Sequence, residues 1–193
     1  MILGLTGFSG SGKSTVAHLL EQHGFYHLDC DRVVHDEVYK DPAVLRALDS
    51  AFGPVAKDGV LDRAALRRCT MGNPLAMKKL NETVMPFIME TLLNKLELHR
   101  NDSVIVDAPL LFESGLNRYC SKVLSVIASP EVALSRIMER DSLSREDAEK
   151  RLNSMHPAAY YVEKSDYIID NSADLSALER AVEELISKLH DQA

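Results

Sequence analysis

A glycine-rich segment near the N-terminus constrains this chain more than any other feature. It reads Gly7-Phe8-Ser9-Gly10-Ser11-Gly12-Lys13-Ser14-Thr15 and matches the phosphate-binding pattern Gly-x-x-x-x-Gly-Lys-Ser/Thr. The apolar run 2–6 before it predicts a buried strand, and residues 13–23 after it predict a helix that ends at Gly24. Backbone N–H groups in such a loop and the N-terminus of its helix both attract anions, so the segment predicts a binding site for nucleotide phosphates.

Each residue type in this loop suits a triphosphate. Glycines at 10 and 12 let the backbone curve around the β-phosphate. Residues Gly10, Ser11, Gly12, Lys13, Ser14 and Thr15 form the predicted loop for a nucleoside triphosphate. Lys13 is expected to bridge the β- and γ-phosphates, and Ser14 to place its hydroxyl on Mg²⁺. The alternative is an ordinary glycine- and serine-rich turn that carries a solvated lysine.

The rest of the chain alternates between strand and helix patterns. Short apolar runs at 26–28, 104–106, 123–127 and 167–169 predict four more strands, with helical segments between them. This alternation predicts an α/β fold with a doubly wound, mainly parallel five-stranded sheet of the P-loop NTPase type. Two stretches interrupt it: a helical insertion of about seventy residues at 31–100, too long for a plain crossover, and a charged helical segment that begins at Arg136.

Composition excludes several classes of protein. The 193 residues suffice for one compact domain, and the net charge of −7 disfavours nonspecific binding to nucleic acid or anionic membranes. No apolar run approaches the roughly 20 residues of a membrane span. The three cysteines, Cys30, Cys69 and Cys120, are odd in number and widely spaced, which argues against a disulfide framework and favours a reducing cytoplasm.

Two carboxylates, Asp29 and Asp31, follow the predicted second strand. Ligands of doubly wound sheets bind outside the carboxyl ends of the strands, so both are expected near the phosphate loop. One would accept the proton of a substrate hydroxyl, and the other would orient the substrate or a magnesium-bound water. The alternative for Asp31 is a simple N-cap of the following helix.

Other nucleotide-binding and metal-binding interpretations find less support. The guanine-reading Asn-Lys-x-Asp pattern is absent, because the nearest string, 94–97, ends in Glu97. A dinucleotide fingerprint would need a third glycine where Thr15 stands. His23 and His27 are four residues apart, but Gly24 interrupts the helix between them, and no third metal ligand is evident. A small kinase remains.

The order and spacing of several motifs resemble the dephospho-coenzyme A kinase family across nearly the whole chain. The motifs are the loop at 5–15, Asp29-Cys30-Asp31, Asp107-Ala108-Pro109-Leu110-Leu111-Phe112-Glu113, Arg136 with Arg140-Asp141, and Asp170-Asn171. The resemblance implies transfer of the γ-phosphate of ATP to the ribose 3′-hydroxyl of dephospho-coenzyme A, the last step of coenzyme A biosynthesis. It also implies a single P-loop kinase domain over 1–193, with a nucleotide-binding core (1–30, 101–135 and 156–193), an acceptor-binding insertion (31–100) and a lid (136–155).

The same resemblance assigns roles to residues and implies that the triphosphate bound by residues 10–15 is ATP. It makes Asp31 the general base, Lys13 the phosphate clamp and Arg140 the cation that neutralises the transferred phosphoryl group; the alternative for Arg140 is a surface pair with Glu139 or Asp141. Asn171 is expected near the adenine of ATP, and Arg136 is a weaker lid candidate. The predicted acceptor-side residues are Asp29, Asp107, Pro109, Leu110 and Leu111, and core packing is the alternative for the two leucines. Asp107 ends its strand as a Walker-B carboxylate does.

The chain departs from the family pattern at several positions. Cys30 stands where alanine is usual, and Phe8 and Ser9 occupy loop positions expected to contribute mainly backbone. Met85 stands where the family usually has histidine, in a His-Pro pair before a long helix, so Pro86 is expected to precede such a helix. Met155 stands where glutamine often follows the lid. Two alternatives remain: a P-loop kinase for another small acceptor, such as a nucleoside or nucleoside monophosphate, and a nucleotide-dependent switch without an acceptor. The expected partners are small molecules, with no nucleic acid or membrane, and a monomer is plausible.

Overall fold

The computed structural model describes residues 1–191 of the chain, in two compact units. The first unit combines Met1–Leu28 with the segment that begins at Asn101, and the second is Asp29–Arg100. The nucleotide-binding core was expected to extend to residue 193, and its last two positions lie outside the described residues.

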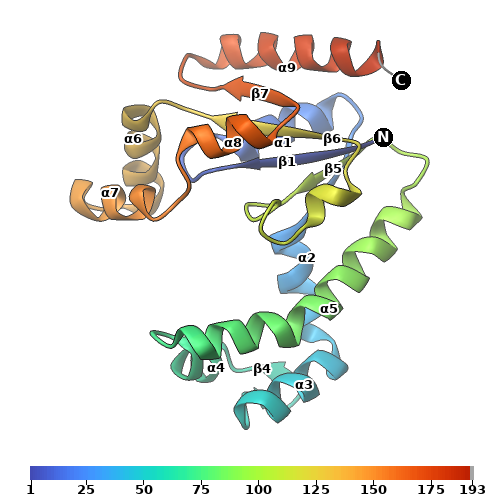
Figure 1. The fold of residues 1–193 in the computed structure, drawn as a ribbon, viewed down its shortest axis with the longest axis vertical. Helices are drawn as coiled ribbons and strands as arrows, with labels where there is room; N and C mark the ends of the chain where they lie inside the picture. The colour runs from blue at the N-terminus through green and yellow to red at the C-terminus, as the bar shows by residue number, and fades with distance from the viewer. Residues whose placement is uncertain (192–193) are drawn as a thin grey trace. The chain divides into compact units, whose positions relative to one another are not determined.

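The first unit is built on a five-stranded sheet with the order β2-β5-β1-β6-β7 (Figure 1). The pairs of β1 with β5, of β1 with β6 and of β6 with β7 are all parallel. This confirms the predicted α/β class and the five-stranded sheet. The strands are β1 (Ile2–Gly7), β2 (Tyr26–Asp29), β5 (Val104–Asp107), β6 (Lys122–Ile127) and β7 (Tyr167–Asp170).

Helices α1 (Lys13–Gln22) and α9 (Leu175–His190) bury one face of this sheet. Their apolar residues recur at helical spacing, with Val16 and Leu20 from α1 and Val182 and Leu185 from α9 in one cluster with the strands. Figure 1 shows α9 alongside β7, the edge strand. The central strands are covered on both sides, so they consist of nearly continuous apolar residues instead of alternating ones.

The segment after β5 packs closely on β1. This segment includes the short helix η2 (Leu116–Tyr119). Helix α8 (Ala158–Lys164), from later in the chain, contacts β6. A Cβ added at Gly4 would lie 2.8 Å from the Leu111 side chain and 2.9 Å from Cys120 Sγ. Glycine at position 4 therefore permits the close approach of this segment to the sheet.

Two helices, α6 (Pro130–Asp141) and α7 (Arg145–Asn153), follow β6. Ser144 caps α7 by accepting the Asp147 N–H at 3.2 Å. The Asp147 carboxylate in turn accepts the Ser144 hydroxyl at 2.8 Å. A full capping box would instead bring the acidic side chain to the backbone N–H of the cap residue. The lid boundaries, 136–155, remain a prediction.

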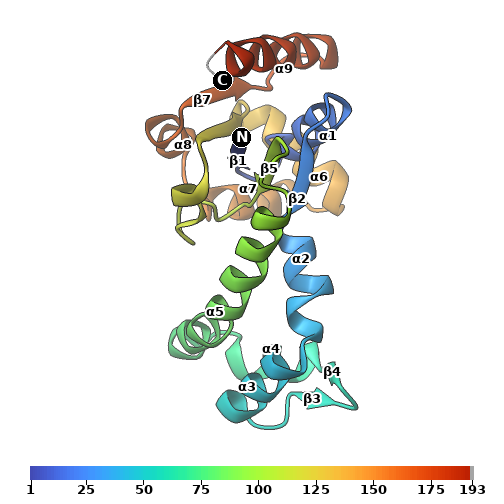
Figure 2. The same ribbon diagram turned by 90° about the vertical axis from the view of Figure 1, so that its right-hand side faces the viewer.

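The second unit is mainly helical (Figure 2). Its core joins Val44 and Leu48 of α3 with Leu66 of α4 and Leu80 and Val84 of α5. Helix α5 begins at Pro74, capped by Asn73, and continues through Pro86 to Leu98, so the expectation that Pro86 precedes a long helix was wrong. The elements are α2 (Cys30–Asp36), η1 (Val38–Lys40), α3 (Pro42–Phe52), β3 (Ala56–Lys57), β4 (Val60–Leu61), α4 (Arg63–Thr70) and α5 (Pro74–Leu98).

None of the helices within residues 1–191 combines the length and apolarity that a bilayer crossing requires.

Candidate nucleotide-binding site

The predicted phosphate loop connects β1 to α1, at the carboxyl end of the central strand. Gly12 takes the N-cap position of α1 with φ of 89°, in the left-handed region that favours glycine. No side chain caps the helix, and its first turn holds no acidic residue. The N-terminal N–H groups and the positive end of the helix dipole therefore suit an anionic ligand.

Gly10 and Gly12 of the loop also lie where a side chain would collide with neighbouring segments. At Gly10, with φ of 83°, an added Cβ would lie 2.5 Å from the backbone oxygen of Ala133 in α6. At Gly12 it would lie 2.1 Å from Asn171 Nδ2. The loop conformation is thus determined by both backbone geometry and close packing.

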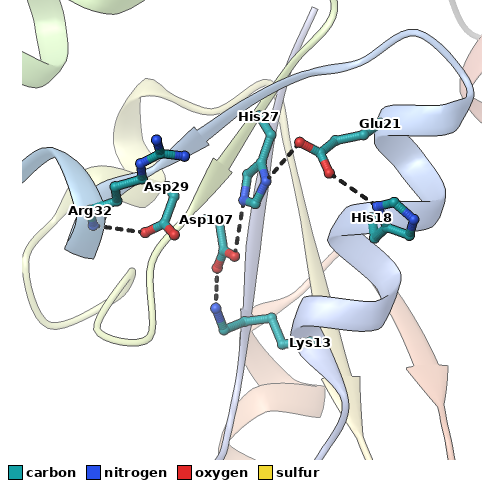
Figure 3. Close-up of polar contacts among 7 residues, drawn as sticks. All are labelled: Lys13, His18, Glu21, His27, Asp29, Arg32 and Asp107. Carbon is teal, nitrogen blue, oxygen red and sulfur yellow. Dashed lines mark hydrogen bonds and ion pairs between the residues drawn. The ribbon is translucent and has the colours of Figure 1, made fainter.

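Lys13 and Asp107 form an ion pair beside this loop (Figure 3). Lys13 comes from the first turn of α1 and Asp107 from the end of β5, so adjacent parallel strands bring them together. The Asp107 side chain is only 7% exposed. A carboxylate so buried requires a positive or hydrogen-bonding partner, and Lys13 provides one.

A second partner for Asp107 was not predicted from the sequence. His27 of β2 brings Nε2 to 3.2 Å from Asp107 Oδ2, and its Nδ1 lies 3.2 Å from Glu21 Oε1 of α1. Figure 3 shows the imidazole between the two carboxylates. In the sequence, His27 was considered only as a possible metal ligand. Its pairing with Asp107 follows from the position of β2 beside β5, which the sequence does not specify.

These contacts shift the protonation equilibria of both groups. The hydrogen bond to Asp107 raises the pKa of His27 above its usual value of 6.5, against burial, and the charges of Asp107 and Glu21 add to it. Burial acts to raise the pKa of Asp107, but the hydrogen bond from His27 and the charge of Lys13 outweigh it and lower that pKa. Asp107 is therefore a carboxylate, and His27 favours its cationic form.

Two side chains from other elements donate hydrogen bonds to backbone carbonyls of the phosphate loop. Asn171, just after β7, is buried and donates Nδ2–H to the Ser11 carbonyl at 2.8 Å. Arg136 of α6 donates to the carbonyls of Gly10 at 3.3 Å and Ser11 at 3.4 Å. Carbonyls engaged this way leave the N–H groups of the loop to face an anion. The predicted role of Asn171 near adenine stays a prediction.

The loop side chains Phe8 and Ser9 contact the segment after α6, contrary to the expectation that they contribute mainly backbone. Phe8 is buried and packs against Tyr161 of α8, with ring centroids 5.9 Å apart. The Ser9 N–H lies 3.2 Å from the sulfur of Met155. Ser9 Oγ accepts a hydrogen bond from Arg140 at 2.9 Å.

Arg140 is half-exposed at the end of α6. Besides Ser9, it binds Asp141 through two hydrogen bonds of 2.9 Å, which is one of the surface pairs considered as an alternative to catalysis. Arg151 of α7 reaches the same carboxylate at 2.7 Å. These contacts place Arg140 beside the phosphate loop with its charge only partly offset, and its catalytic role stays a prediction.

In the second unit, Asp29 and Asp31 have different positions on α2. Asp29 is the N-cap, and its carboxylate accepts the Arg32 N–H at 2.9 Å (Figure 3). Asp31 lies within the first turn, so the alternative that Asp31 caps this helix was wrong. The Asp31 side chain is exposed. Its assignment as the general base remains a prediction, as does an acceptor-side role for Asp29.

The residues after Asp107 divide between surface and core. Pro109 is exposed and Leu110 is 65% exposed, whereas Leu111 is fully buried. The carbonyl of Pro109 accepts the hydroxyl proton of Thr6 from β1 at 3.2 Å. Core packing thus accounts for Leu111, and the acceptor-side roles of Pro109 and Leu110 remain open to test.

The donor atoms near the loop fit Mg²⁺. Ser14 is exposed in the first turn of α1 and offers a hard oxygen ligand. Within residues 1–191 no group of three or more His, Cys, Asp or Glu side chains could enclose a metal ion. Mg²⁺ prefers oxygen ligands, keeps several waters and takes other ligands from phosphate, so the Ser14 hydroxyl is a ligand of the type it accepts. The buried Ser11 hydroxyl, without a hydrogen-bond partner among the described residues, further suits a polar ligand here.

Comparisons with known proteins agree with this geometry. The family model described as Dephospho-CoA kinase matches residues 1–177. A Dephospho-CoA kinase from Latilactobacillus sakei is 38% identical over 180 residues, covering 91% of this chain and 89% of the relative. Another, from Fusobacterium nucleatum, is 38% identical over 186 residues and covers 95% of both chains.

Solved structures give the same result. A crystal structure of a Thermus thermophilus protein has a TM-score of 0.79 at 33% identity, covering 98% of this chain and 97% of that one. A dephospho-CoA kinase from Campylobacter jejuni has a TM-score of 0.74 at 27% identity, covering 97% and 96%. Shikimate kinase from Bacteroides thetaiotaomicron, at 14% identity, 98% coverage of both chains and a TM-score of 0.58, shares the fold. Together with the matching family model, these similarities show that the chain belongs to the dephospho-CoA kinase family.

Proposed function

We propose that this protein transfers the γ-phosphoryl group of ATP to the ribose 3′-hydroxyl of dephospho-coenzyme A, giving coenzyme A and ADP in the cytoplasm. The observation that carries the proposal is the phosphate loop, with Lys13 paired to Asp107 at its edge, in a member of this family. The proposed substrates are small molecules, and neither nucleic acid nor membrane takes part.

The loop binds and orients the triphosphate. Its N–H groups and the N-terminus of α1 face the β-phosphate, and Lys13 contacts the β- and γ-phosphates. Ser14 supplies a hydroxyl ligand for Mg²⁺. When bound, Mg²⁺ would offset the negative charge of the phosphate oxygens.

Transfer also requires a base and a cation. The Asp31 carboxylate accepts the proton of the attacking 3′-hydroxyl. Arg140, whose guanidinium already lies beside Ser9 of the loop, offsets the charge that develops on the phosphoryl oxygens. Phosphoryl transfer leaves little covalent work for the protein, so positioning and electrostatics provide most of the rate enhancement.

The test is ADP release with Mg-ATP and dephospho-coenzyme A, run beside AMP, adenosine and a control without acceptor, with the product identified by mass. We expect dephospho-coenzyme A alone to gain one phosphate. The variant Lys13→Ala serves as the control for contaminating kinases and should lose acceptor-dependent ADP release. Equal or faster turnover with AMP or adenosine would contradict the proposed acceptor while leaving a small-molecule kinase, and no acceptor-dependent ADP would contradict both.

A further inference from the structure

The Lys13–Asp107 pair creates a problem that the protein must solve when it binds ATP. Lys13 can contact the phosphates only by sharing its ammonium with them or by leaving the carboxylate. Asp107 has a side chain 7% exposed, so water cannot readily replace the lost partner. Breaking a buried ion pair leaves an uncompensated charge, which is strongly unfavourable.

His27 provides the second partner that Asp107 needs. Its Nε2 faces Oδ2 of Asp107 at 3.2 Å, whereas Lys13 is paired with the other oxygen, Oδ1. The two partners therefore occupy different oxygens and do not compete. A carboxylate held by His27 keeps its orientation and a hydrogen bond while Lys13 turns to the phosphates.

Glu21 fixes the imidazole from its other side. Both ring nitrogens lie 3.2 Å from carboxylate oxygens, which accept hydrogen bonds, so the cationic imidazole, with an N–H on each nitrogen, matches both partners. The raised pKa of His27 agrees with this arrangement. The His27 side chain is 19% exposed, so the surrounding residues limit the rotation of the ring away from the two carboxylates. The charges from Lys13 to Glu21 then alternate in sign.

We propose that His27 is a positioning residue for nucleotide binding, which holds the Asp107 carboxylate so that Lys13 can transfer to the phosphates of ATP. The inference rests on the proposed use of Lys13 as the phosphate clamp, and it does not depend on which acceptor the enzyme uses. His27 acts through Asp107 and Lys13, and it makes no contact with the reacting atoms in this proposal.

The test compares Mg-ATP binding by calorimetry for the wild type, His27→Leu, His27→Gln and His18→Leu. His18 is the matched control, because it also contacts Glu21, at 3.5 Å, but from the exposed surface of α1. We expect His27→Leu to raise the Kd for Mg-ATP about tenfold, equivalent to about 1.4 kcal/mol. His27→Gln should restore much of the affinity, because its amide N–H can reach the same oxygen. His18→Leu should bind as the wild type.

Steady-state kinetics separate positioning from general damage. His27→Leu should raise the KM for ATP with little change in the KM for the acceptor, whereas a loosened fold would affect both. A double-mutant cycle repeats His27→Leu in an Asp107→Asn background. There the effect of the His27 substitution on ATP affinity should largely disappear. The cycle uses His27→Ala, which also lacks a hydrogen-bond donor, in place of His27→Leu if the leucine variant does not fold.

Several outcomes would overturn the proposal. They are unchanged ATP affinity in folded His27→Leu, an equal loss in His18→Leu, or an undiminished effect of the His27 substitution in the Asp107→Asn background. Because calorimetry needs no acceptor, a failure of the dephospho-coenzyme A assay would not affect this result. Conversely, normal turnover by a His27→Leu enzyme with unchanged ATP affinity would overturn only the positioning role.

Discussion

Asn171 Nδ2 donates a hydrogen bond of 2.8 Å to the carbonyl of Ser11, across 160 residues of sequence. This contact joins the end of β7, an edge strand, to the phosphate loop that follows the central strand. The order of the sheet makes it possible, because β7 is separated from β1 by β6 alone. A residue near the C-terminal helix therefore supports the loop near the N-terminus.

The variant Asn171→Ala should lower the free energy of unfolding by about 1 to 3 kcal/mol, because the Ser11 carbonyl loses its closest donor. It should also weaken Mg-ATP binding, since the loop conformation is less restricted. Urea denaturation and calorimetry measure the two effects. Asn171→Asp, which keeps the shape but places a carboxylate oxygen against the carbonyl, should be at least as damaging. Wild-type stability in both variants would show that this hydrogen bond is dispensable.

Substitution of Gly10 separates packing from backbone strain. Gly10 and Gly24 have similar φ values, 83° and 87°, but only Gly10 has a neighbour within 4 Å of an added Cβ. Gly24→Ala should cost about 1 kcal/mol, the usual penalty of a left-handed alanine. Gly10→Ala should cost distinctly more, because it also forces the loop away from the Ala133 carbonyl of α6.

Thermal or urea unfolding of the two alanine variants, combined with Mg-ATP binding, tests this difference. Gly24→Ala should keep wild-type affinity, because it lies after α1 and away from the loop. Equal losses of stability and affinity in both variants would mean that strain alone, without the contact to α6, explains the requirement for glycine.

Asp29 and Asp31 should respond differently to substitution. Asp31→Asn should lower kcat by about 10²-fold while ATP affinity stays near wild type, because the amide cannot accept the substrate proton. Asp29→Ala should instead lower stability by about 1 kcal/mol, because it removes the N-cap of α2. Steady-state kinetics measure the expected loss of kcat in Asp31→Asn, and urea denaturation measures the expected loss of stability in Asp29→Ala. Normal turnover by Asp31→Asn would require a different base.

Arg140 and Arg151 form a matched pair, because both bind the carboxylate of Asp141 but only Arg140 reaches the loop through Ser9. Arg140→Ala should lower kcat by about 10²-fold, as expected for a lost cation at the developing charge. Arg151→Ala should change kcat little. Comparable losses in the two variants would indicate that Asp141 and its partners organise the segment without direct catalysis by Arg140.

Stability should depend on pH through His27 and Asp107. The pKa of His27 is raised in the folded state, mainly by its hydrogen bond to Asp107, so its contribution is complete below its usual value of 6.5. That contribution is lost as the pH rises through the folded-state pKa. The stability difference between the wild type and His27→Leu should therefore be larger at about pH 5.5 than at about pH 8.5.

The contribution of Asp107 to the free energy of unfolding has the opposite pH dependence, because it is lost as the pH falls. Despite burial, His27 and Lys13 lower its pKa below the usual 3.8, so its contribution is present above that value and is lost as the pH falls through the folded-state pKa. Urea denaturation of the wild type and Asp107→Asn across the acidic range measures it. A stability difference that does not diminish toward low pH would contradict an ionised, paired Asp107.

The fold class and the positions of the strands could be predicted from short segments of the sequence. The motif at 7–15 needs only neighbouring residues to form a turn before a helix, and the β-branched runs at 104–106 and 123–127 are apolar enough to predict buried strands. The kinase family was indicated by the order and spacing of motifs along nearly the whole chain, whereas these local patterns predicted the α/β class and the five strands. They act over a few residues, which is why a sequence reveals them directly.

Tertiary structure decided which distant side chains support the loop. The contacts of Lys13 with Asp107 and of Asn171 with Ser11 span 94 and 160 residues. Phe8 fits no local pattern, yet it is buried against Tyr161. Such pairings depend on strand order and on the lengths of the connections, which residue spacing alone does not specify.

His27 illustrates the division most clearly. Its sequence neighbours suggest only a strand residue or a weak metal ligand, whereas the sheet places β2 beside β5 and turns the imidazole toward Asp107. The strand itself could be predicted, because local hydrophobicity depends only on the residues of the segment. The partner of the imidazole came from strand order, because only the folded sheet brings a buried carboxylate within hydrogen-bond distance of it.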